Sequence, residues 1–597
     1  MYRFVVFQQV RADQAATALM SKLSQRLFES DGWRLVSSND GLKIFDTGGV
    51  SGRMDGVPIH RAGEREARGA ILGQIFRKDG SSRVDSAFAD RVIASGGRSL
   101  PDEAWGRYVA FILAEDASSL SIIRAPQGEL PCLSISQGGV NVHASYMPDL
   151  AALGLSPFTV DWDQVARFMA SQRPVPGATA LEGVAETPPG VLRRASAAGC
   201  ENETLWSAER IALDRDEASP ADAACRLRAS VLDAVSAWSG RYGRVFLNLS
   251  GGLDSSIVLA ALTRASRRPD INCLNFHSPQ IEGDERVYAR AMAARAGVRL
   301  SEASMSSDDI DLTRIFRVAK GVSPENYLFE RPDRYFPQGW VEAQAMEACF
   351  YGSGGDNVFF QPHTILGAID YAASHGWRPG LLSAALDAAR LTRRSIWSVL
   401  GSVAARPRGA GEASEGSLAG VRNPLISPDV WAALDKASEP SAPSALPPGK
   451  RLHIQVATFC PSYYEPKEDG ETFMERVSPL FSQPLVETCL RLPTWTLTAG
   501  GRDRALARQA FERDLPSVIV NRQSKGGADR MVTNAFDRQR PFLRETLMDG
   551  VLANRGMLDR GALDAALTNR DPTIAAGSVG LLMILCAEAW ARRWTDR

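Results

Sequence analysis

The sequence predicts an α/β protein with a β-rich N-terminal half, then a doubly wound parallel sheet, then a helical C-terminal part. Short apolar runs separated by Gly-rich turns fill residues 1–205, whereas helical and strand-like runs alternate from about residue 221. From about residue 377 the pattern is mostly helical. Because 597 residues of 44% hydrophobic content exceed one ordinary domain, we expect two domains, at residues 1–205 and 206–597.

The N-terminal half is strand-like, most clearly at residues 108–113 and 119–124. The opening Met1-Tyr-Arg-Phe-Val-Val-Phe7 is too short and too strand-like for a signal peptide. We therefore expect a β-rich domain in a protein without a secretory leader.

The next segment alternates helices with strands, which is the order of a doubly wound parallel sheet. In such a sheet, ligands bind at the carboxyl ends of the strands. The expected elements are helices at residues 221–238, 255–264 and 285–296 and strands at residues 245–249 and 271–276.

The helical C-terminal part contains two stretches rich in Gly, Pro, Ser and Ala, at residues 405–421 and 438–450. Their composition predicts mobile loops that could cover the active site. The most apolar run, residues 579–587, is followed by Glu588 and Arg592, so we expect a buried C-terminal helix instead of a membrane span.

Composition argues against several partners. The net charge is −1, from 68 basic and 69 acidic residues, so the chain lacks the basic excess of a nucleic-acid-binding protein. The eight cysteines are scattered and no close pair has metal-site spacing. We therefore expect reduced thiols in a cytoplasmic protein that binds neither nucleic acid nor membrane.

The run Arg244-Val-Phe-Leu-Asn-Leu-Ser-Gly-Gly-Leu-Asp-Ser-Ser256 is the most informative part of the chain, because an apolar strand breaks into a Ser-Gly-Gly turn that opens a helix. Glycines let the backbone approach an anion closely, and the amides at a helix N-terminus attract negative charge. Asp254 among these phosphate-attracting groups indicates that Mg²⁺ accompanies the nucleotide. The predicted nucleotide contacts are Leu249, Ser250, Gly251, Gly252, Asp254, Ser255 and Ser256.

Ser-Gly-Gly alone is also typical of an ordinary strand-to-helix turn, but the full run is more specific. It is not the P-loop pattern, which needs Gly-Lys-Ser/Thr after a spaced Gly. It resembles the PP-loop of ATP pyrophosphatases, which split ATP between its α and β phosphates and transfer AMP to an acceptor.

A second Gly-rich turn, Phe350-Tyr-Gly-Ser-Gly-Gly-Asp-Asn-Val-Phe359, follows another apolar run. If the two loops lie at neighbouring strand ends, Tyr351 and Gly352 face the nucleotide and Asp356 shares the Mg²⁺ with Asp254. Alone, Asp356 would be a turn or helix-cap residue.

Lys525 lies between Ser524 and two glycines, where a lysine has little to pack against. A flexible ammonium suits a leaving pyrophosphate, whose charge grows in the transition state, although a solvated loop lysine is the commoner case. We therefore predict Asp254, Asp356 and Lys525 as the catalytic set.

Five motifs in this order resemble the asparagine synthetase family: Leu249-Ser-Gly-Gly-Leu-Asp-Ser-Ser256, Asp284-Glu285, Tyr351-Gly-Ser-Gly-Gly-Asp356, Ser478-Pro-Leu-Phe481 and Arg522-Gln-Ser-Lys525. The N-terminal half resembles that family's class II, Ntn-type glutaminase domain in Gly106-Arg-Tyr108 and Arg124-Ala-Pro-Gln-Gly128. Such a glutaminase needs a cysteine directly after Met1, with its own α-amine as base, and this chain has Tyr2. The resemblance therefore implies a degenerate glutaminase-like domain that supplies no ammonia.

The synthetase half departs from the family as well. Where asparagine synthetases carry Ser-Gly-Glu-Gly-x-Asp-Glu, this chain has Ser353 for the first Glu and Asn357 for the last. Two branches keep the ATP chemistry, lack the cysteine and use an amine within the substrate: β-lactam synthetases and lasso peptide cyclases. The Gly-Ser-Gly-Gly-Asp-Asn-Val-Phe and Arg-Gln-Ser-Lys-Gly-Gly runs are most similar to the lasso peptide cyclases.

That resemblance implies an ATP-dependent, AMP-forming ligase that adenylates an Asp or Glu side chain of a leader-cleaved precursor peptide. The peptide N-terminal amine then closes a macrolactam. A maturation protease and a leader-binding protein are the implied partners. No base for the amine is assigned: Glu325 and Tyr327 lie between the two loops in sequence, but surface and core roles are commoner for such residues.

Other functions stay open at this point. A β-lactam synthetase shares the same losses and differs in substrate size, and an ammonia-dependent asparagine synthetase would need the Glu that Ser353 replaces. A non-catalytic peptide-binding scaffold would have no need for all of Asp254, Asp356 and Lys525.

Overall fold

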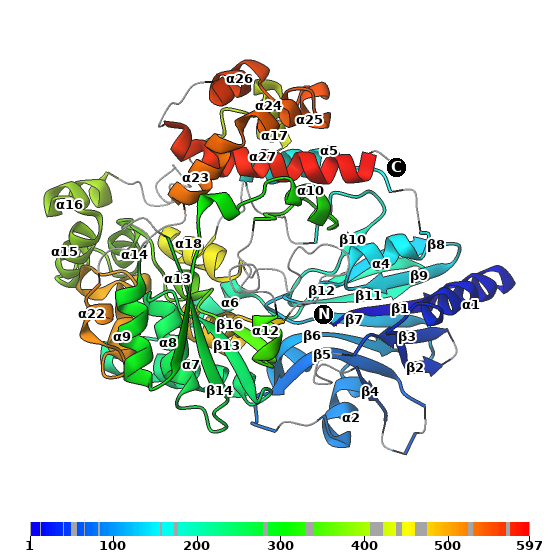
Figure 1. Cartoon of the computed structure of the whole chain (residues 1–597). Coiled ribbons are helices and arrows are strands. Elements are labelled where there is room, and N and C mark those ends of the chain that lie inside the picture. Colours follow the sequence, from blue (N-terminus) through cyan, green and yellow to red (C-terminus); the bar gives the residue numbers. More distant parts are fainter. Residues whose placement is uncertain are drawn as a thin grey trace.

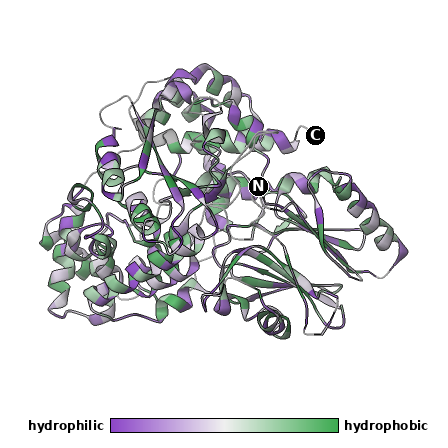
Figure 2. Ribbon diagram, turned by 60° about the horizontal axis from the view of Figure 1, so that its bottom comes forward, coloured by the Kyte–Doolittle hydropathy of each residue, from purple (hydrophilic) through white to green (hydrophobic). Residues whose placement is uncertain are grey.

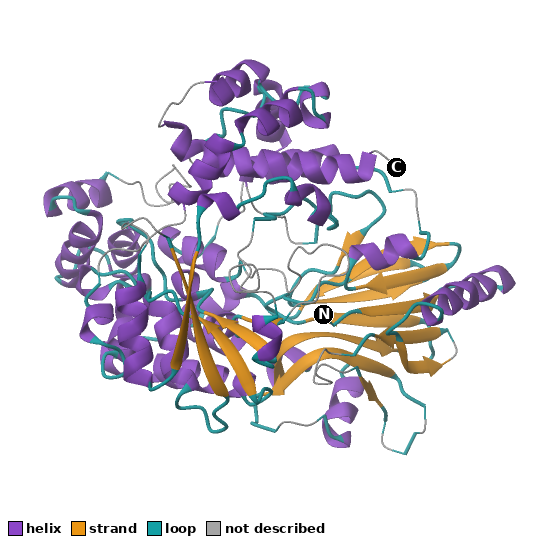
Figure 3. Ribbon diagram, viewed as in Figure 1, coloured by secondary structure: helices purple, strands orange, loops and turns teal. Residues whose placement is uncertain are grey.

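The computed structural model confirms the predicted fold class, with antiparallel sheets, a parallel sheet and a helical C-terminal part (Figures 1 and 3). The parallel sheet lies on the left of Figure 1 and the antiparallel sheets on the right, with the helices after residue 529 above both. The structure describes residues 2–595 except 12, 40, 49–55, 62, 65, 82–83, 156–157, 172–176, 279–283, 329–338, 406–421, 438–443, 460–473, 523–528 and 569–572.

The N-terminal half contains two six-stranded antiparallel sheets, with the orders β10-β8-β9-β1-β3-β2 and β12-β11-β7-β6-β5-β4. The strands of the first are β1 (Phe4–Gln9), β2 (Arg34–Asn39), β3 (Leu42–Asp46), β8 (Leu133–Gln137), β9 (Val140–Ala144) and β10 (Ala185–Glu186). The strands of the second are β4 (Val57–Ile59), β5 (Gly69–Arg77), β6 (Ala104–Leu113), β7 (Ser119–Arg124), β11 (Val191–Ser196) and β12 (Gly199–Thr204). The helices of this half are α1 (Gln14–Phe28), α2 (Ser86–Ala94), α3 (Leu100–Glu103), α4 (Met147–Ala152) and α5 (Trp162–Ser171); α6 (Ala208–Leu213) follows it and packs in the apolar cluster of the second half.

The two antiparallel sheets share one apolar core. Alternate residues of β1, such as Phe4 and Val6, pack with Val109 and Phe111 of β6, because side chains two apart on a strand face the same side. Hydrophobic residues line the strands of both sheets (Figure 2). The inner faces of the two sheets thus form a sandwich.

Tyr2 lies in this core, just before β1. Its side chain is fully buried, and its hydroxyl donates to Asp46 Oδ2 at 3.2 Å. Asp46 also pairs with Arg34 and accepts from the amide of Gly56 at 2.6 Å. Position 2 therefore holds a phenol ring with a structural hydrogen bond.

The second half is built on a five-stranded parallel sheet of order β15-β14-β13-β16-β17, in which each strand runs parallel to its neighbours. Its strands are β13 (Arg244–Asn248), β14 (Asp270–His277), β15 (Arg299–Ser304), β16 (Ala348–Tyr351) and β17 (Glu475–Val477). The chain runs outward from β13 through β14 to β15 and returns to the other side of β13 as β16. The order therefore reverses next to β13, which is where ligands bind in such sheets.

The helices around this sheet follow the predicted order closely. They are α7 (Pro220–Ser239), α8 (Leu253–Leu262) and α9 (Arg286–Ala296), with Gly297 left-handed after α9 (φ 63°). Helix α8 begins two residues before the predicted start, because Gly252 is its N-cap. On the opposite face, Trp340 of the short helix α12 (Trp340–Ala343) stacks on Phe246, with ring centroids 5.7 Å apart.

The remaining helices form the C-terminal part. They are α10 (Arg314–Val318), α13 (Gly355–Val358), α14 (Leu366–His375), α15 (Gly380–Thr392), α16 (Ile396–Ala404), α17 (Pro428–Ala437), α18 (Pro448–Ala457), α19 (Gln483–Arg491), α20 (Thr494–Leu497), α21 (Ala505–Phe511), α22 (Ser517–Val520), α23 (Asp529–Arg538), α24 (Arg540–Met548), α25 (Val551–Asn554), α26 (Arg560–Thr568) and α27 (Thr573–Thr595). Residues 406–421 and 438–443 of the predicted mobile loops lie outside the described residues, and α18 begins within the second one.

Helix α27 is the buried C-terminal helix that the sequence predicts, with residues 581–587 in the core. One apolar cluster joins it to residues of the N-terminal half, including Val165 of α5. Figure 1 shows α27 crossing above α10. No helix in the described part of the chain has the length and hydropathy of a membrane span.

Glu588 explains how a carboxylate fits inside this core. It is fully buried and accepts from the amides of Val551 at 2.8 Å and Leu552 at 3.0 Å, at the start of α25, and it pairs with Arg592 at 2.7 Å. Those amides are donors that α25 itself cannot satisfy.

We therefore expect Glu588→Ala to destabilise the C-terminal part by roughly 2–4 kcal/mol, because it leaves buried donors without an acceptor. Hydrogen exchange of the Val551 and Leu552 amides measures this loss locally. Glu545→Ala, an exposed glutamate of the neighbouring α24, is the matched control. Equal exchange in the two variants would contradict the assigned role.

Candidate active site

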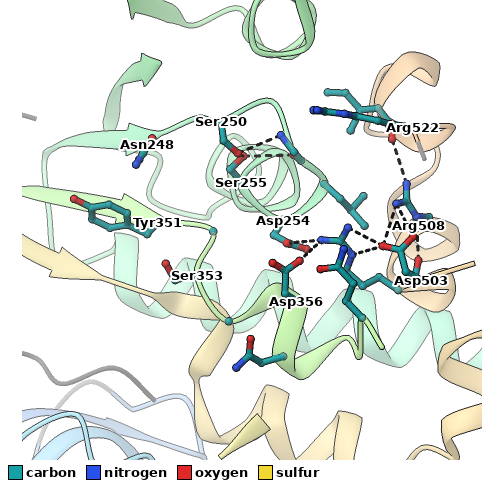
Figure 4. A pocket seen from close by; sticks show the side chains of 18 of the residues that line it. Asn248, Ser250, Asp254, Ser255, Tyr351, Ser353, Asp356, Asp503, Arg508 and Arg522 are labelled. Atoms are coloured by element: carbon teal, nitrogen blue, oxygen red, sulfur yellow. Dashed lines mark hydrogen bonds and ion pairs between the residues drawn. The ribbon is translucent and has the colours of Figure 1, made fainter. Parts of the chain in front are cut away.

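A cavity of about 460 Å³ opens where β13 and β16 end side by side, at the point where the strand order reverses. The two Gly-rich loops predicted from the sequence form its walls, together with the start of α21 and Arg522 (Figure 4). Its lining residues are Asn248, Ser250, Gly252, Leu253, Asp254, Ser255, Tyr351, Gly352, Ser353, Gly354, Asp356, Asn357, Gln361, His363, Phe459, Phe481, Asp503, Arg504, Arg508, Ile519 and Arg522.

The first loop joins β13 to α8 through a left-handed glycine, Gly251 (φ 81°). A Cβ there would lie 2.9 Å from the amide nitrogen of Ala289 in α9, so the loop can approach α9 only without a side chain. Ser250 Oγ accepts from the Gly252 amide at 3.2 Å and lies 3.2 Å from Ser255 Oγ. The loop is thus fixed with the α8 N-terminus directed at the cavity.

Three predicted contacts of this loop lie behind the cavity wall. Ser256 is fully buried and donates to the Gly252 carbonyl at 2.7 Å, and the Leu249 amide donates to the Leu274 carbonyl at 2.8 Å. Leu249, Gly251 and Ser256 are not among the lining residues, so their contact with a nucleotide stays a prediction.

The second loop fits against the first because two of its residues are glycines. A Cβ on Gly352 would lie 2.5 Å from the Ser255 nitrogen, and one on Gly355 would lie 2.2 Å from Asp254 Cγ. No side chain can be accommodated at such distances. The two loops therefore close on each other, and Asp254 and Asp356 come to face the same point.

Arg504 occupies that point. Its Nη1 donates to Asp254 Oδ2 at 2.7 Å and also contacts Asp356 Oδ1, and its backbone is left-handed (φ 49°). Burial opposes the charged guanidinium, but Asp254, Asp356 and Asp503 outweigh it and raise the pKa of Arg504. Figure 4 shows the carboxylates of Asp254 and Asp356 directed toward each other.

The sequence analysis did not identify Arg504 as a site residue. The sequence shows only the dense charge of Arg502-Asp-Arg504 before an apolar helix face, which does not reveal the partners of Arg504.

Two further arginines shape the cavity. Arg508 donates to the Val520 carbonyl at 2.8 Å and pairs with Asp503 at 3.2 Å. Arg522 lies over the Tyr288 ring with 4.0 Å to its centroid, pairs with Glu285, and donates to the Gly251 carbonyl at 3.3 Å. Arg522 therefore links the first loop to the N-terminal end of α9.

Lys525 lies outside the described residues, so its contact with a leaving pyrophosphate stays a prediction. Arg522, three residues earlier in the same motif, does line the cavity.

The donor set fits a nucleotide-bound Mg²⁺. Among the described residues no group of three or more His, Cys, Asp or Glu side chains could hold a metal alone. Asp254 and Asp356 nevertheless converge on one cationic atom, Nη1 of Arg504. Magnesium takes one or two carboxylates and completes its shell with phosphate oxygens and water, which matches two carboxylates beside a phosphate-binding loop.

The residues considered as an acid/base pair lie elsewhere. Neither Glu325 nor Tyr327 lines the cavity. The Tyr327 ring is buried in the cluster that contains α27, and its hydroxyl lies 3.5 Å from the Ser323 carbonyl. Burial raises the pKa of Glu325 to about 8. This pair is therefore separate from the nucleotide loops.

The model of the asparagine synthase family matches residues 226–592 of this sequence, more than half of the chain. The chain belongs to the asparagine synthase family. It is accordingly an ATP-dependent amide ligase in class, and the matched range contains both loops and all the carboxylates and arginines of the cavity.

Other comparisons add little. No curated protein sequence matches the chain. Among solved structures, the "structure of the allosteric regulatory enzyme of purine biosynthesis" matches at 10% identity over 51% of this chain and 80% of that one, with a TM-score of 0.21. The "glutamine phosphoribosylpyrophosphate (PRPP) amidotransferase from B. subtilis complexed with ADP and GMP" matches at 11% identity over 60% and 77%, also with a TM-score of 0.21. At these values neither similarity bears on the function.

We expect Arg504→Met to make the protein respond to free Mg²⁺. Without the guanidinium, Asp254 and Asp356 repel each other and attract a divalent cation. Millimolar MgCl2 should then stabilise the variant by about 1 kcal/mol, seen as a rise in the unfolding midpoint that EDTA reverses. The wild type and Arg508→Met, which keeps the bridge, should respond less. An equal response in all three proteins would show that the bridge does not shield the two carboxylates.

Glu325 predicts a pH effect. Its pKa is raised from 4.5 to about 8 by burial, so between these values the folded state holds a proton that the unfolded state releases. Stability from this group is complete below pH 4.5 and is lost as pH rises through about 8. Glu325→Gln should therefore gain stability relative to wild type between pH 5 and pH 8, measured from unfolding midpoints. A constant difference would contradict this.

Proposed function

We propose that this protein is a lasso peptide cyclase, which uses Mg-ATP to join an Asp or Glu side chain of a leader-cleaved peptide to the peptide's own N-terminal amine. The observation that supports the proposal most is the meeting of two Gly-rich loops at adjacent strand ends, with Asp254 and Asp356 directed at one cation. This arrangement suits cleavage between the α and β phosphates of ATP.

The first step is adenylation. A carboxylate oxygen of the peptide attacks the α phosphorus, the bond to the bridging oxygen breaks, and pyrophosphate leaves. The amides of the first loop and the α8 N-terminus lie where they can hold the departing charge, and Lys525 is proposed to add a cation there. Magnesium, held by Asp254 and Asp356, would supply charge neutralisation at the phosphates.

The second step is closure of the ring. The N-terminal amine attacks the acyl carbon, AMP leaves, and the peptide becomes lighter by one water. The protein's contribution is to hold the amine close to the activated carbon, where effective molarity is worth roughly 7–11 kcal/mol. The apolar lining residues Phe459, Phe481 and Ile519 help to exclude water that would hydrolyse the adenylate.

The substitutions in the second loop favour this substrate class over aspartate and ammonia. Ser353 lines the cavity in place of a family glutamate, and Asn357 donates to the Val456 carbonyl at 2.9 Å, which makes it a clamp on α18. Tyr2 fills the position of the ammonia-producing cysteine. A small-molecule amide ligase of the β-lactam synthetase kind shares these features and is distinguished by substrate size.

The proposal includes partners and a location. A peptide that arrives without its leader requires a maturation protease and a leader-binding protein, and synthesis of such peptides takes place in the cytoplasm. A short precursor reading frame beside this gene would support the assignment.

The test is ATP–pyrophosphate exchange with the leader-free peptide, combined with mass spectrometry of the product. We expect exchange and a peptide lighter by one water, and a loss on the order of 100-fold in Asp254→Ala. The control is Asp435→Asn, an exposed aspartate of α17 that pairs with Arg422 outside the cavity. Exchange with free aspartate or another small amino acid would replace the cyclase by a small-molecule ligase, and absence of exchange with every carboxylate would leave only a scaffold.

A further inference from the structure

The antiparallel and parallel sheet systems meet at β17, the short edge strand of the parallel sheet. Two buried polar residues of the N-terminal half connect to it, Arg107 on β6 directly and Gln74 on β5 through Tyr242. They are direct cross-strand partners in the antiparallel ladder, so their side chains leave the same face of that sheet. The N-terminal half thus presents a polar pair to a strand beside the cavity.

Arg107 makes three directional contacts, one within the N-terminal half and two across the boundary to β17. Its Nε donates to Glu129 Oε2 at 2.6 Å, its Nη1 to Glu475 Oε1 at 3.1 Å, and its Nη2 to the Arg476 carbonyl at 2.9 Å. The guanidinium also lies 5.1 Å from the centroid of Trp238 in α7, and only 2% of the residue is exposed. Arg107 therefore holds both a side chain and the backbone of β17.

Gln74 reaches the same strand through one intermediate. Its Nε2 donates to the Tyr242 hydroxyl at 3.3 Å, and that hydroxyl hydrogen-bonds to the Glu475 carboxylate. Tyr242 also packs edge-on against Phe350 of β16, with centroids 5.9 Å apart. The contacts of Gln74 and Arg107 thus converge on Glu475.

From β17 the contacts continue into the cavity wall. The Arg476 guanidinium lies 4.4 Å from the centroid of the Tyr351 ring, and its Nη2 lies 3.4 Å from Ser353 Oγ. Tyr351 and Ser353 both line the cavity on the side of the second loop. Arg107 binds the backbone of Arg476, and the side chain of Arg476 contacts this wall. A single residue therefore connects Arg107 to the cavity wall.

We propose that Arg107 is a positioning residue: through β17 it fixes Arg476 against Tyr351 and Ser353, and so sets the wall of the cavity that faces the acyl substrate. The identity of the substrate rests on the proposed function, whereas the link from Arg107 through β17 to the cavity wall does not.

Only arginine fits this role. The planar guanidinium directs Nε, Nη1 and Nη2 at three acceptors in fixed directions, which the single ammonium of lysine cannot match. A buried ion pair adds little stability compared with apolar residues of similar volume. If Arg107 served only to stabilise the fold, apolar residues would serve as well. The directed hydrogen bonds of Arg107 instead hold β17 in one defined position.

Arg124 provides a matched control within the same sheet. It is also a buried arginine, but its partners all lie in the N-terminal half: the carbonyls of Gly128, Leu130 and Thr187, and Glu186. Loss of the Arg124 guanidinium should destabilise the N-terminal half without moving β17.

The first experiment is hydrogen exchange on the full chain. Arg107→Lys should speed exchange in residues 475–477 and 351–356 by about tenfold, and leave residues 249–256 unchanged, whereas Arg124→Lys should affect neither segment. If Arg107→Lys does not fold, Glu475→Gln keeps the side-chain shape, weakens the same pairing and carries the same expectation. Equal exchange in the two arginine variants would overturn the proposal.

The second experiment separates positioning from a general loss of structure. With the leader-free peptide, Arg107→Lys should raise the KM for peptide about tenfold and change the KM for ATP less than about twofold, because the first loop, which holds most of the predicted nucleotide contacts, is untouched and only Tyr351 and Gly352 belong to the second. In the Arg476→Lys background, Arg107→Lys should have no further effect on peptide KM. Additive effects, or parallel losses for ATP and peptide, would overturn the role of Arg107, whereas an inactive wild type would count only against the proposed function.

Discussion

The site depends on two carboxylates held next to each other. Asp254 and Asp356 come from loops about a hundred residues apart, and one guanidinium, that of Arg504, bridges them. The positive charge of the guanidinium offsets the repulsion between the two negative charges. The glycines at positions 352 and 355 are required because any Cβ there would separate the loops, and the strand order is required because it makes β13 and β16 neighbours.

The N-terminal half also contributes to the geometry of the site. A domain with Tyr2 buried in its core cannot offer a thiol at that position, yet its Arg107 side chain connects to the edge strand of the other sheet directly and its Gln74 side chain through Tyr242. That strand carries Arg476, which contacts Tyr351 and Ser353 in the second-loop wall of the cavity. On the proposed function, the parallel sheet would bind the nucleotide and the antiparallel sheets would fix the side of the cavity that takes the acyl substrate.

Local patterns account for what the sequence could predict. Adjacent residues specify strand β13, its Ser-Gly-Gly turn and the helix after it. The second Gly-rich loop has a similar local sequence pattern. Arg504 and Arg107 could not be predicted, because their roles come from partners more than a hundred residues away and, for Arg504, from a left-handed backbone that no neighbouring residue indicates. Glu325 and Tyr327 illustrate the converse: closeness in sequence to both loops does not bring them to the cavity. Lys525 stays a prediction from its motif alone.

The proposed function requires that a peptide carboxylate be activated by attack on the α phosphate of ATP. Transfer of an oxygen label distinguishes this route: the peptide is prepared with ¹⁸O in its side-chain carboxylates, and the nucleotide product is analysed by mass spectrometry. We expect one ¹⁸O in AMP for each ring closed, because the carboxylate oxygen stays on the α phosphorus when the amine displaces AMP from the acyl carbon. Unlabelled AMP, or formation of ADP with the label in phosphate, would contradict it.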